Sequence, residues 1–393
     1  MPPELDDRPT DASAGRPRRP SLSSIAIGGA WGYIGRKFTD AALELGLDTT
    51  VYDPGEPPDD APLDRIARVL DGEAFYRAPA DLYHLALHPE HRALALEILL
   101  ERSRSEPILI LNEKPMAHPE EPAACQELID AVSASGAVMF FDFPELFDPM
   151  TRRITEFLGG FDSVAIRDIQ VQRSKDREAR DNPRNRKRMV HIQYQEAVHC
   201  IAFALNLLAH CRGGAAQACD DGVSVQARSQ PYDPPNPEDY AYVVDGRCDY
   251  EIDFGEASLR GCTNFKSGAP WEKSRVIRGT GDGRDFTIEA DYLEGAKYLR
   301  IDGRDQSMDP EGSSYTGVLE TMGEWTAVQT APELMTGLYP HPAFTRLTYQ
   351  LSSLLWRSCH DEAPARVADT AGLIGFEAGF AEAAEGFPRY GTT

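Results

Sequence analysis

The stretch Ile25-Ala-Ile-Gly28-Gly29-Ala-Trp31-Gly32-Tyr33-Ile34-Gly35 decides how the first part of the chain folds. Its apolar start predicts a strand from Ser24 to Gly28, and the residues after the glycines predict a helix from Tyr33 to Leu45. Glycine lets a phosphate group approach the backbone closely, and a helix N-terminus adds partial positive charge. The stretch therefore predicts a strand-to-helix turn that can hold a pyrophosphate.

The spacing of the glycines fits one dinucleotide-binding pattern better than another. Gly-x-Gly-x-x-Gly is matched only in its last two positions, because Ile27 stands where its first glycine belongs. The alternative spacing Gly29-x-x-Gly32-x-x-Gly35 is complete. Since a purely structural tight turn gives the same letters, the surrounding sequence has to decide between the two interpretations.

Asp53 supplies part of that context, because it follows the second predicted strand, Thr49 to Tyr52. A carboxylate at this position can accept hydrogen bonds from both ribose hydroxyls of an adenosine, and it repels a 2′-phosphate. We therefore expect NAD as the cofactor, with NADP left open. The structural alternative is an aspartate that only forms the turn before Pro54 and Gly55.

A second motif, Glu113-Lys114-Pro115, follows the apolar strand predicted from Pro107 to Asn112. It puts a lysine where the far end of a dinucleotide bound at the glycine turn would lie. The two motifs together indicate a nicotinamide-dependent oxidoreductase, which neither of them indicates alone.

Strand and helix patterns alternate through the first 145 residues, which predicts a parallel, doubly wound sheet. One short helix is expected from Leu63 to Leu70, and another from Pro89 to Arg102. From Val223 to Asp302 strand patterns dominate, which predicts an antiparallel sheet. The fold class expected is α/β, with an N-terminal Rossmann domain and a C-terminal α+β domain.

The expected organisation has three parts: a disordered tail over residues 1–21, a dinucleotide-binding domain over 22–145, and a domain for substrate binding and oligomerisation over 146–393. The net charge of −23 argues against non-specific nucleic-acid binding. The seven cysteines form no Cys-x-x-Cys pair, and no metal site is expected. No signal peptide and no long apolar run is seen, so we expect a cytoplasmic protein without a membrane span.

With both motifs in place, the chain resembles the glucose-fructose oxidoreductase/inositol dehydrogenase (Gfo/Idh/MocA) family. The resemblance also rests on Ala86-Leu-His88-Pro89-Glu-His91 before an apolar helix and on a later helix that carries His199. It implies a Rossmann domain and an open, largely antiparallel sheet that commonly forms dimer or tetramer contacts. The reaction it implies is hydride exchange between nicotinamide and a hydroxyl or ketone of a sugar-like molecule.

The resemblance and the chemistry suggest roles for individual residues. Lys114 is expected to stabilise a developing oxyanion, and His199 to accept the hydroxyl proton. The simpler alternatives are a surface lysine at a strand end and a histidine satisfied within its helix. Cofactor contacts are expected from the following residues: Gly28, Gly29, Trp31, Gly32, Tyr33, Ile34, Asp53, His88, Pro89, His91, Glu113 and Lys114.

One departure from the family concerns the position four residues before the histidine, which is usually Asp and here is Gln195. Glutamine can hydrogen-bond but cannot accept a proton. Glu196, three residues before His199, is the expected substitute for the carboxylate. Tyr194 and Gln195 are expected substrate contacts, and the identity of the proton acceptor stays open.

A basic segment leads into this helix, with eight basic and three acidic residues between Arg173 and Arg188. Arginines can clamp a carboxylate or a phosphate. Arg184 and Arg186 are therefore expected substrate contacts, and the substrate is expected to carry negative charge. The alternative is a solvated loop or a salt-bridge patch between subunits.

Two other functions stay open at this point. One is a non-catalytic relative that binds a dinucleotide and regulates a partner. The other is a glycosidase-like enzyme that uses transient oxidation by a tightly bound NAD. Retention of Lys114 and His199 favours a dehydrogenase over the regulatory relative.

Overall fold

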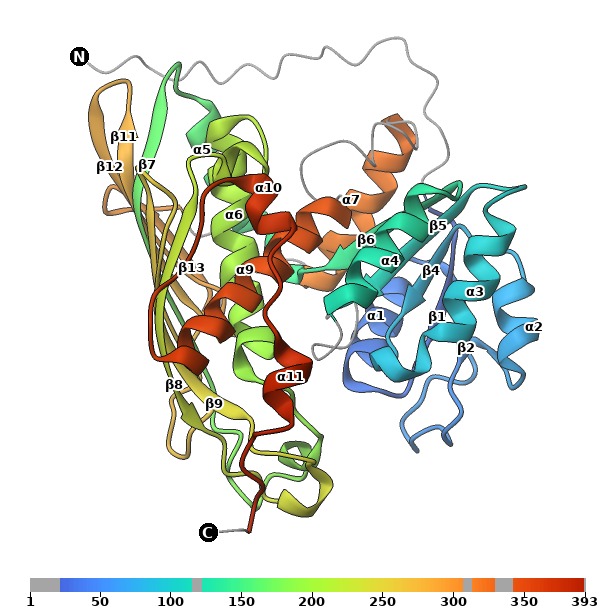
Figure 1. The fold of residues 1–393 in the computed structure, drawn as a ribbon. Coiled ribbons are helices and arrows are strands. Elements are labelled where there is room, and N and C mark those ends of the chain that lie inside the picture. The colour runs from blue at the N-terminus through green and yellow to red at the C-terminus, as the bar shows by residue number, and fades with distance from the viewer. Residues whose placement is uncertain (1–21, 115–121, 307–312, 329–341, 392–393) are drawn as a thin grey trace.

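The computed structural model describes residues 22–114, 122–306, 313–328 and 342–391. Two sheets, each with its own helices, organise these residues (Figure 1). We refer to sheet A with its helices as the N-terminal domain and to sheet B with its helices as the C-terminal domain. The boundary expected after residue 145 stays a prediction, and the expected tail over residues 1–21 lies outside the described residues.

Sheet A is parallel and has the strand order β3-β2-β1-β4-β5-β6. Its strands are β1 (Ser24–Gly28), β2 (Asp48–Tyr52), β3 (Ala67–Val69), β4 (Leu82–Leu85), β5 (Ile108–Glu113) and β6 (Ala137–Asp142). This is the doubly wound order, in which the order of the strands reverses between β1 and β4 and ligands bind outside the carboxyl ends of the strands. The predicted α/β fold class is confirmed.

The helices of the N-terminal domain are α1 (Tyr33–Glu44), α2 (Gly72–Arg77), α3 (Ala93–Arg102) and α4 (Pro122–Ser133). The helix expected over Leu63 to Leu70 is wrong, because this segment supplies strand β3, which pairs with β2. Helix α2 begins after this strand, at Gly72. The Asp71 side chain accepts a hydrogen bond from the Ala74 backbone N–H and caps the first turn of α2. The helix expected from Pro89 starts with a 3₁₀ turn before α3.

Sheet B is larger and has the order β14-β13-β12-β11-β7-β10-β9-β8-β15. All its pairs are antiparallel except that of β7 with β10. Its strands are β7 (Val164–Ser174), β8 (Val223–Pro231), β9 (Asp245–Asp253), β10 (Ser258–Asn264), β11 (Ser274–Gly281), β12 (Arg284–Asp291), β13 (Tyr298–Ile301), β14 (Arg304–Asp305) and β15 (Ala365–Val367). The antiparallel sheet expected from the sequence is thus present, with one parallel pair.

Helices cover the face of sheet B that is turned toward the N-terminal domain (Figure 1). They include α5 (Pro149–Gly159), α6 (Val198–Arg212) and α9 (Pro342–Asp361), followed by the short α10 (Thr370–Ile374) and α11 (Phe380–Ala384). Helix α7 (Ser314–Val328) instead returns to the N-terminal domain, where Val318 and Met322 share a core with Ile27 and Phe38. The C-terminal part of the chain therefore helps to complete the core of the N-terminal domain.

Gly35 sets how closely α1 packs on the turn after β1. A Cβ atom at this position would lie 2.1 Å from the Gly29 carbonyl oxygen and 2.8 Å from the Ala30 Cα. Gly29 has φ +84°, in the left-handed region that favours glycine. The helix start can therefore lie directly against the turn only because neither position carries a side chain.

We expect Gly35→Ala to destabilise the protein by about 2–3 kcal/mol, because the new methyl group forces apart backbone segments that cannot move independently. Gly386→Ala is the matched control, since its Cβ would come no closer than 3.6 Å to a neighbouring atom. Chemical unfolding measures both variants. Equal stability of the two variants would contradict the packing role of Gly35.

Candidate active site

A cavity of about 1280 Å³ is lined by residues from both domains. The N-terminal domain contributes the start of α1, Gly32 to Ile34, together with the ends of β5 and β6. The C-terminal domain contributes the end of β7, the loop after it and the start of α6. The cavity thus lies at the edge of sheet A where the doubly wound fold binds ligands.

The glycine turn and Asp53 lie together at one end of this arrangement. The Asp53 carboxylate accepts hydrogen bonds from the backbone N–H of Trp31, at 2.9 Å, and of Gly55, at 2.8 Å. The hydrogen bond from Gly55 stabilises the turn after β2, as the structural alternative expected. The hydrogen bond from Trp31 also joins Asp53 to the glycine turn. Gly28, Gly29, Trp31 and Asp53 support or border the helix start but do not line the cavity.

Of the residues expected from the segment after β4, His88 and Pro89 line the cavity and His91 does not. His91 is exposed at the end of the 3₁₀ turn Pro89–His91. Arg92, which follows it, is buried and donates hydrogen bonds to the carbonyl oxygens of Leu87, at 2.8 Å, and Glu113, at 2.6 Å. The segment is therefore fixed against the lysine motif by Arg92 rather than by a histidine.

Lys114 reaches from the end of β5 to the C-terminal domain. Its Nζ donates a hydrogen bond to the Gln195 carbonyl oxygen at 3.0 Å. Burial lowers the pKa of Lys114, while the negative charges of Glu196 and Glu113 oppose this shift. Lys114 is thus not a free surface lysine, and its amine lies beside the helix that carries His199. Pro115 of the motif lies outside the described residues.

The sequence analysis did not predict Asp142, which lines the cavity at the end of β6. Asp142 is the neighbour of Glu113 in the sheet, and its Oδ1 atom is buried without a hydrogen-bond partner. Burial and the Glu113 carboxylate raise the pKa of Asp142 well above its usual range. The protonated form of Asp142 is therefore favoured beside the Glu113 carboxylate. Since parallel strands end at one edge, the adjacency of two acidic strand ends could have revealed it.

His199 lines the cavity at the start of α6, directly after a π-helical turn formed by Gln193–Ala197. The residue is 7% exposed, and its ring packs edge-on against Phe143. Its Nδ1 atom is buried without a hydrogen-bond partner among the described residues. Burial, followed by the charges of Arg173 and Lys114, lowers the pKa of His199 well below its usual range, so the neutral imidazole is favoured.

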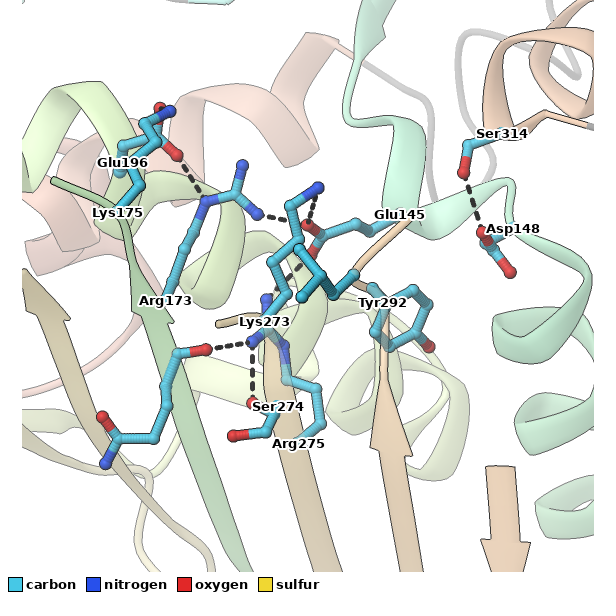
Figure 2. Close-up of polar contacts among 12 residues, drawn as sticks. Glu145, Asp148, Arg173, Lys175, Glu196, Lys273, Ser274, Arg275, Tyr292 and Ser314 are labelled. Carbon is cyan, nitrogen blue, oxygen red and sulfur yellow. Dashed lines mark hydrogen bonds and ion pairs between the residues drawn. The ribbon is translucent and has the colours of Figure 1, made fainter. Parts of the chain in front are cut away.

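Glu196 is held as an anion. Its carboxylate accepts from Arg173 Nε at 2.5 Å and from Lys175 Nζ at 2.9 Å (Figure 2). Although burial raises the pKa of Glu196, the charges of Lys175, Arg173 and Lys114 hold it well below the usual range. A carboxylate with so low a pKa is a poor proton acceptor, so Glu196 acts on the site through its charge. Burial lowers the pKa of Lys175 to about 8.

Figure 2 shows how Arg173 lies between Glu196 and Glu145, to which it is also ion-paired. Glu145 accepts a further hydrogen bond from Arg275 Nη2 at 2.8 Å and lies 3.8 Å from Lys273 Nζ. Although burial opposes ionisation, Arg173 and Arg275 lower the pKa of Glu145 far below its usual range. Glu145 comes from the segment after β6, whereas both arginines come from sheet B, so this network joins the domains.

The four expected substrate contacts separate into two groups. Gln195 and Arg184 line the cavity, but Tyr194 and Arg186 do not. Tyr194 is buried against α9, where its hydroxyl donates to Ser353 Oγ at 3.1 Å and its ring lies beside Tyr349. Arg186 is exposed, and only its carbonyl oxygen is fixed, by Asn236. The structure therefore gives neither of these two side chains access to a ligand in the cavity.

Arg184 lies over the ring of Tyr33 with 3.9 Å between the guanidinium carbon and the ring centroid. This contact joins the basic loop to the first turn of α1. Among the described residues, no group of three or more His, Cys, Asp or Glu side chains is placed to hold a metal ion. In the same part of the chain, no helix has the length and apolar character needed to cross a membrane.

Comparison with known proteins shows likeness only in three dimensions. No protein-family model and no curated protein matches the sequence. UDP-N-acetylglucosamine 3-dehydrogenase GnnA from Acidithiobacillus ferrooxidans is similar at 13% identity with a TM-score of 0.61, over 86% of this chain and 98% of that chain. The WlbA dehydrogenase from Chromobacterium violaceum, crystallised with NADH and UDP-GlcNAcA, is similar at 12% identity with a TM-score of 0.62, over 90% and 99%.

Gal80p from Saccharomyces cerevisiae, in a super-repressor mutant, is similar at 12% identity with a TM-score of 0.67, over 91% of this chain and 100% of that chain. The resemblance to Gfo/Idh/MocA-type dehydrogenases is therefore confirmed at the level of the fold. Gal80p from Kluyveromyces lactis, described as a transcriptional regulator, is similar as well. The fold is therefore shared by dehydrogenases and by a transcriptional regulator. Function has to be argued from the cavity.

We expect Glu145→Gln to destabilise the protein by about 3–5 kcal/mol, because it leaves Arg173 and Arg275 buried without their shared anion. Asp285→Asn is the control, since it removes an ion pair to Arg167 in which both side chains are more than half exposed. That loss should stay below about 1 kcal/mol. Chemical unfolding compares the two, and equal small losses would mean that the network does not hold the domains.

The raised pKa of Asp142 predicts a pH-dependent stability. The folded protein keeps this proton at pH values at which the unfolded chain has released it, so stability falls as the pH rises from the usual pKa of an aspartate toward the raised one. Asp142→Asn removes this loss, so the stability difference in favour of the variant should grow as the pH rises above the usual range of an aspartate. Unfolding curves at several pH values measure it. A constant difference between the two proteins would show that Asp142 is already ionised.

Proposed function

We propose that this chain is an NAD(P)-dependent oxidoreductase that transfers a hydride between nicotinamide and a hydroxyl or ketone carbon of a polyhydroxylated small molecule. One observation carries the proposal: a single cavity has the glycine-preceded start of α1 at one side and both Lys114 and His199 at another. The similarity to GnnA, a dehydrogenase, and to WlbA, crystallised with NADH, supports the same class of reaction.

The residues fit a dinucleotide. The start of α1 lies directly against a tight glycine turn, and a helix N-terminus in this position suits a pyrophosphate. Asp53 has its carboxylate fixed beside this turn by the Trp31 N–H, and each oxygen retains a lone pair for a ribose hydroxyl. Gly32, Tyr33, Ile34, His88, Pro89, Glu113 and Lys114 would hold the cofactor. When bound, the cofactor supplies hydride acceptance or donation at its nicotinamide ring.

Lys114 and His199 would act on the substrate oxygen. The Lys114 amine, fixed by the Gln195 carbonyl, can donate a hydrogen bond to an oxygen that gains negative charge. The neutral His199 ring lines the cavity and can accept the proton of a substrate hydroxyl. The anionic Glu196 and Glu145 favour the resulting imidazolium, while Arg173 and Lys114 disfavour it. The carboxylate that the family usually places near the histidine is therefore replaced by fixed charges.

A non-catalytic regulator is the second candidate, because Gal80p shares the fold. Both functions require dinucleotide binding, so turnover rather than binding separates them. Lys114 and His199 at one cavity favour catalysis, since a regulator needs no general base.

Self-association through the open face of sheet B and a cytoplasmic location stay predictions. The outward residues of that face include Asp168, which pairs with Arg260 and Arg278 at 2.6 and 2.7 Å. A homodimer or homotetramer formed there would therefore join polar surfaces, and its stability should fall as the salt concentration rises.

Melting temperatures with NADH and NADPH test the cofactor site. A ligand at about 100 times its Kd stabilises by about 2.7 kcal/mol, so binding is visible as a shift. NADH should give the larger shift, and Asp53→Asn should reduce its preference over NADPH about tenfold or more, because the charge that repels a 2′-phosphate is lost. An unchanged preference in the variant would remove Asp53 from the site. No shift with either cofactor would refute the proposed function.

Lys114→Met tests the chemistry. We expect hydride transfer to fall about 100-fold or more, because the donor to the developing oxyanion is lost, while NADH still binds. Single-turnover oxidation of bound NADH with a panel of keto sugars measures the step, and His199→Asn should show a similar loss. Full turnover by Lys114→Met would assign the lysine a structural role only.

A further inference from the structure

Arg177 is a buried cation that forms no ion pair with a carboxylate in the part of the chain that the structure describes. It follows β7, is 9% exposed and lines the cavity. Its Nε atom is buried without a hydrogen-bond partner, and its Nη2 atom contacts only the Met189 sulfur, at 3.3 Å, among the contacts seen in the described residues. Burial lowers the pKa of Arg177. A desolvated guanidinium is costly unless an anion compensates it, so its position indicates a partner that is not part of the chain.

Two more cations of the same loop line the cavity beside it. Arg184 lies over Tyr33, and Lys187 has its pKa lowered by burial and by the charges of Arg184 and Arg177. Neither forms an ion pair with a carboxylate of the described residues, and the nearby Glu196 is already bound by Arg173 and Lys175. Three positive charges thus crowd one wall of the cavity without a matching acid.

The loop that carries these cations is fixed rather than loosely solvated. Asn185 is fully buried and its amide donates to the Ala179 carbonyl oxygen at 2.9 Å. The Asn182 side chain accepts from the Arg184 backbone N–H at 3.0 Å, and Asn236 donates to the Arg186 carbonyl oxygen at 2.8 Å. The backbone that carries the three cations is therefore set before any ligand binds, which lowers the entropic cost of binding.

We propose that Arg177, Arg184 and Lys187 form a subsite for a phosphate or carboxylate group of the substrate. Assigning this anionic group to the substrate rests on the proposed function, whereas the presence of an anion subsite rests on the geometry of the loop. Arg184 contacts the first turn of α1. Arg177 interacts electrostatically with Glu196, which precedes His199 by three residues. The subsite thus extends from the cofactor turn toward the reacting end of the cavity. Both kinds of oxyanion match the planar fork of arginine.

The test uses inorganic phosphate as the probe on the NADH-saturated protein, with sodium chloride at equal ionic strength as reference. Phosphate should raise the melting temperature, and Arg177→Met should weaken its apparent affinity about tenfold or more, because hydrogen bonds to a charged group are lost. The shift given by NADH should stay, and the ligand-free variant should melt no lower than the unmodified protein, since an uncompensated buried charge is gone. Arg186→Met removes the same charge from the same loop outside the cavity and should change neither shift.

Three outcomes would overturn the subsite. The phosphate shift could survive in Arg177→Met, or Arg186→Met could lose it equally. Equal losses of phosphate and NADH binding in Arg177→Met would instead assign the cations to the cofactor pyrophosphate. If Arg177→Met does not fold, Lys187→Met is used, with a several-fold loss of phosphate affinity expected and an unchanged affinity contradicting the subsite. If the unmodified protein does not bind NADH, the proposed function fails, and the phosphate titration without NADH still decides the subsite.

Discussion

The ion pairs of Glu145 with Arg173 and Arg275 are the interaction on which the cavity depends. All three side chains are buried, and buried charges persist only where the geometry satisfies them. Glu145 follows the last strand of sheet A, and the two arginines lie on neighbouring strands of sheet B. Their pairing therefore fixes the strand ends of one domain against the sheet of the other, and the space between becomes the cavity.

The same network sets the charge state of the candidate reacting groups. Arg173 continues from Glu145 to Glu196, and Glu196 lies beside Lys175 and near Lys114. Anions and cations alternate, so Glu196 stays ionised, and burial with the positive charges keeps His199 neutral. Asp142 adds a carboxyl group whose pKa is raised by burial and by Glu113. The site thus brings a neutral imidazole, a fixed amine and a carboxyl group with a raised pKa to one cavity.

The parts of the fold that local sequence determines were predictable. A glycine turn between strand and helix and a lysine after an apolar strand are local patterns, and both lie where they were expected. The helix prediction for Leu63–Leu70 was wrong because a three-residue edge strand has no periodicity of its own and forms by pairing with β2. Tyr194 was expected to contact the substrate but does not line the cavity. It lies in a π-helical turn and packs against α9, which follows about 150 residues later in the chain.

The rest of the site could not be read from motifs. Asp142 and Glu145 come from the end of β6 and the turn after it, and Arg177 comes from the loop after β7; only the tertiary fold brings these two segments to one cavity. The count of basic residues after Arg173 indicated an anion, but it could not separate the buried Arg177 from the exposed Arg186, because charge patterning does not encode burial.

A crystal structure of the protein with NADH is the decisive measurement. We expect a dinucleotide with its pyrophosphate at the start of α1, its adenosine ribose at Asp53 and its nicotinamide ring beside Lys114 and His199. A dinucleotide bound elsewhere, or a nicotinamide ring turned away from Lys114 and His199, would contradict it.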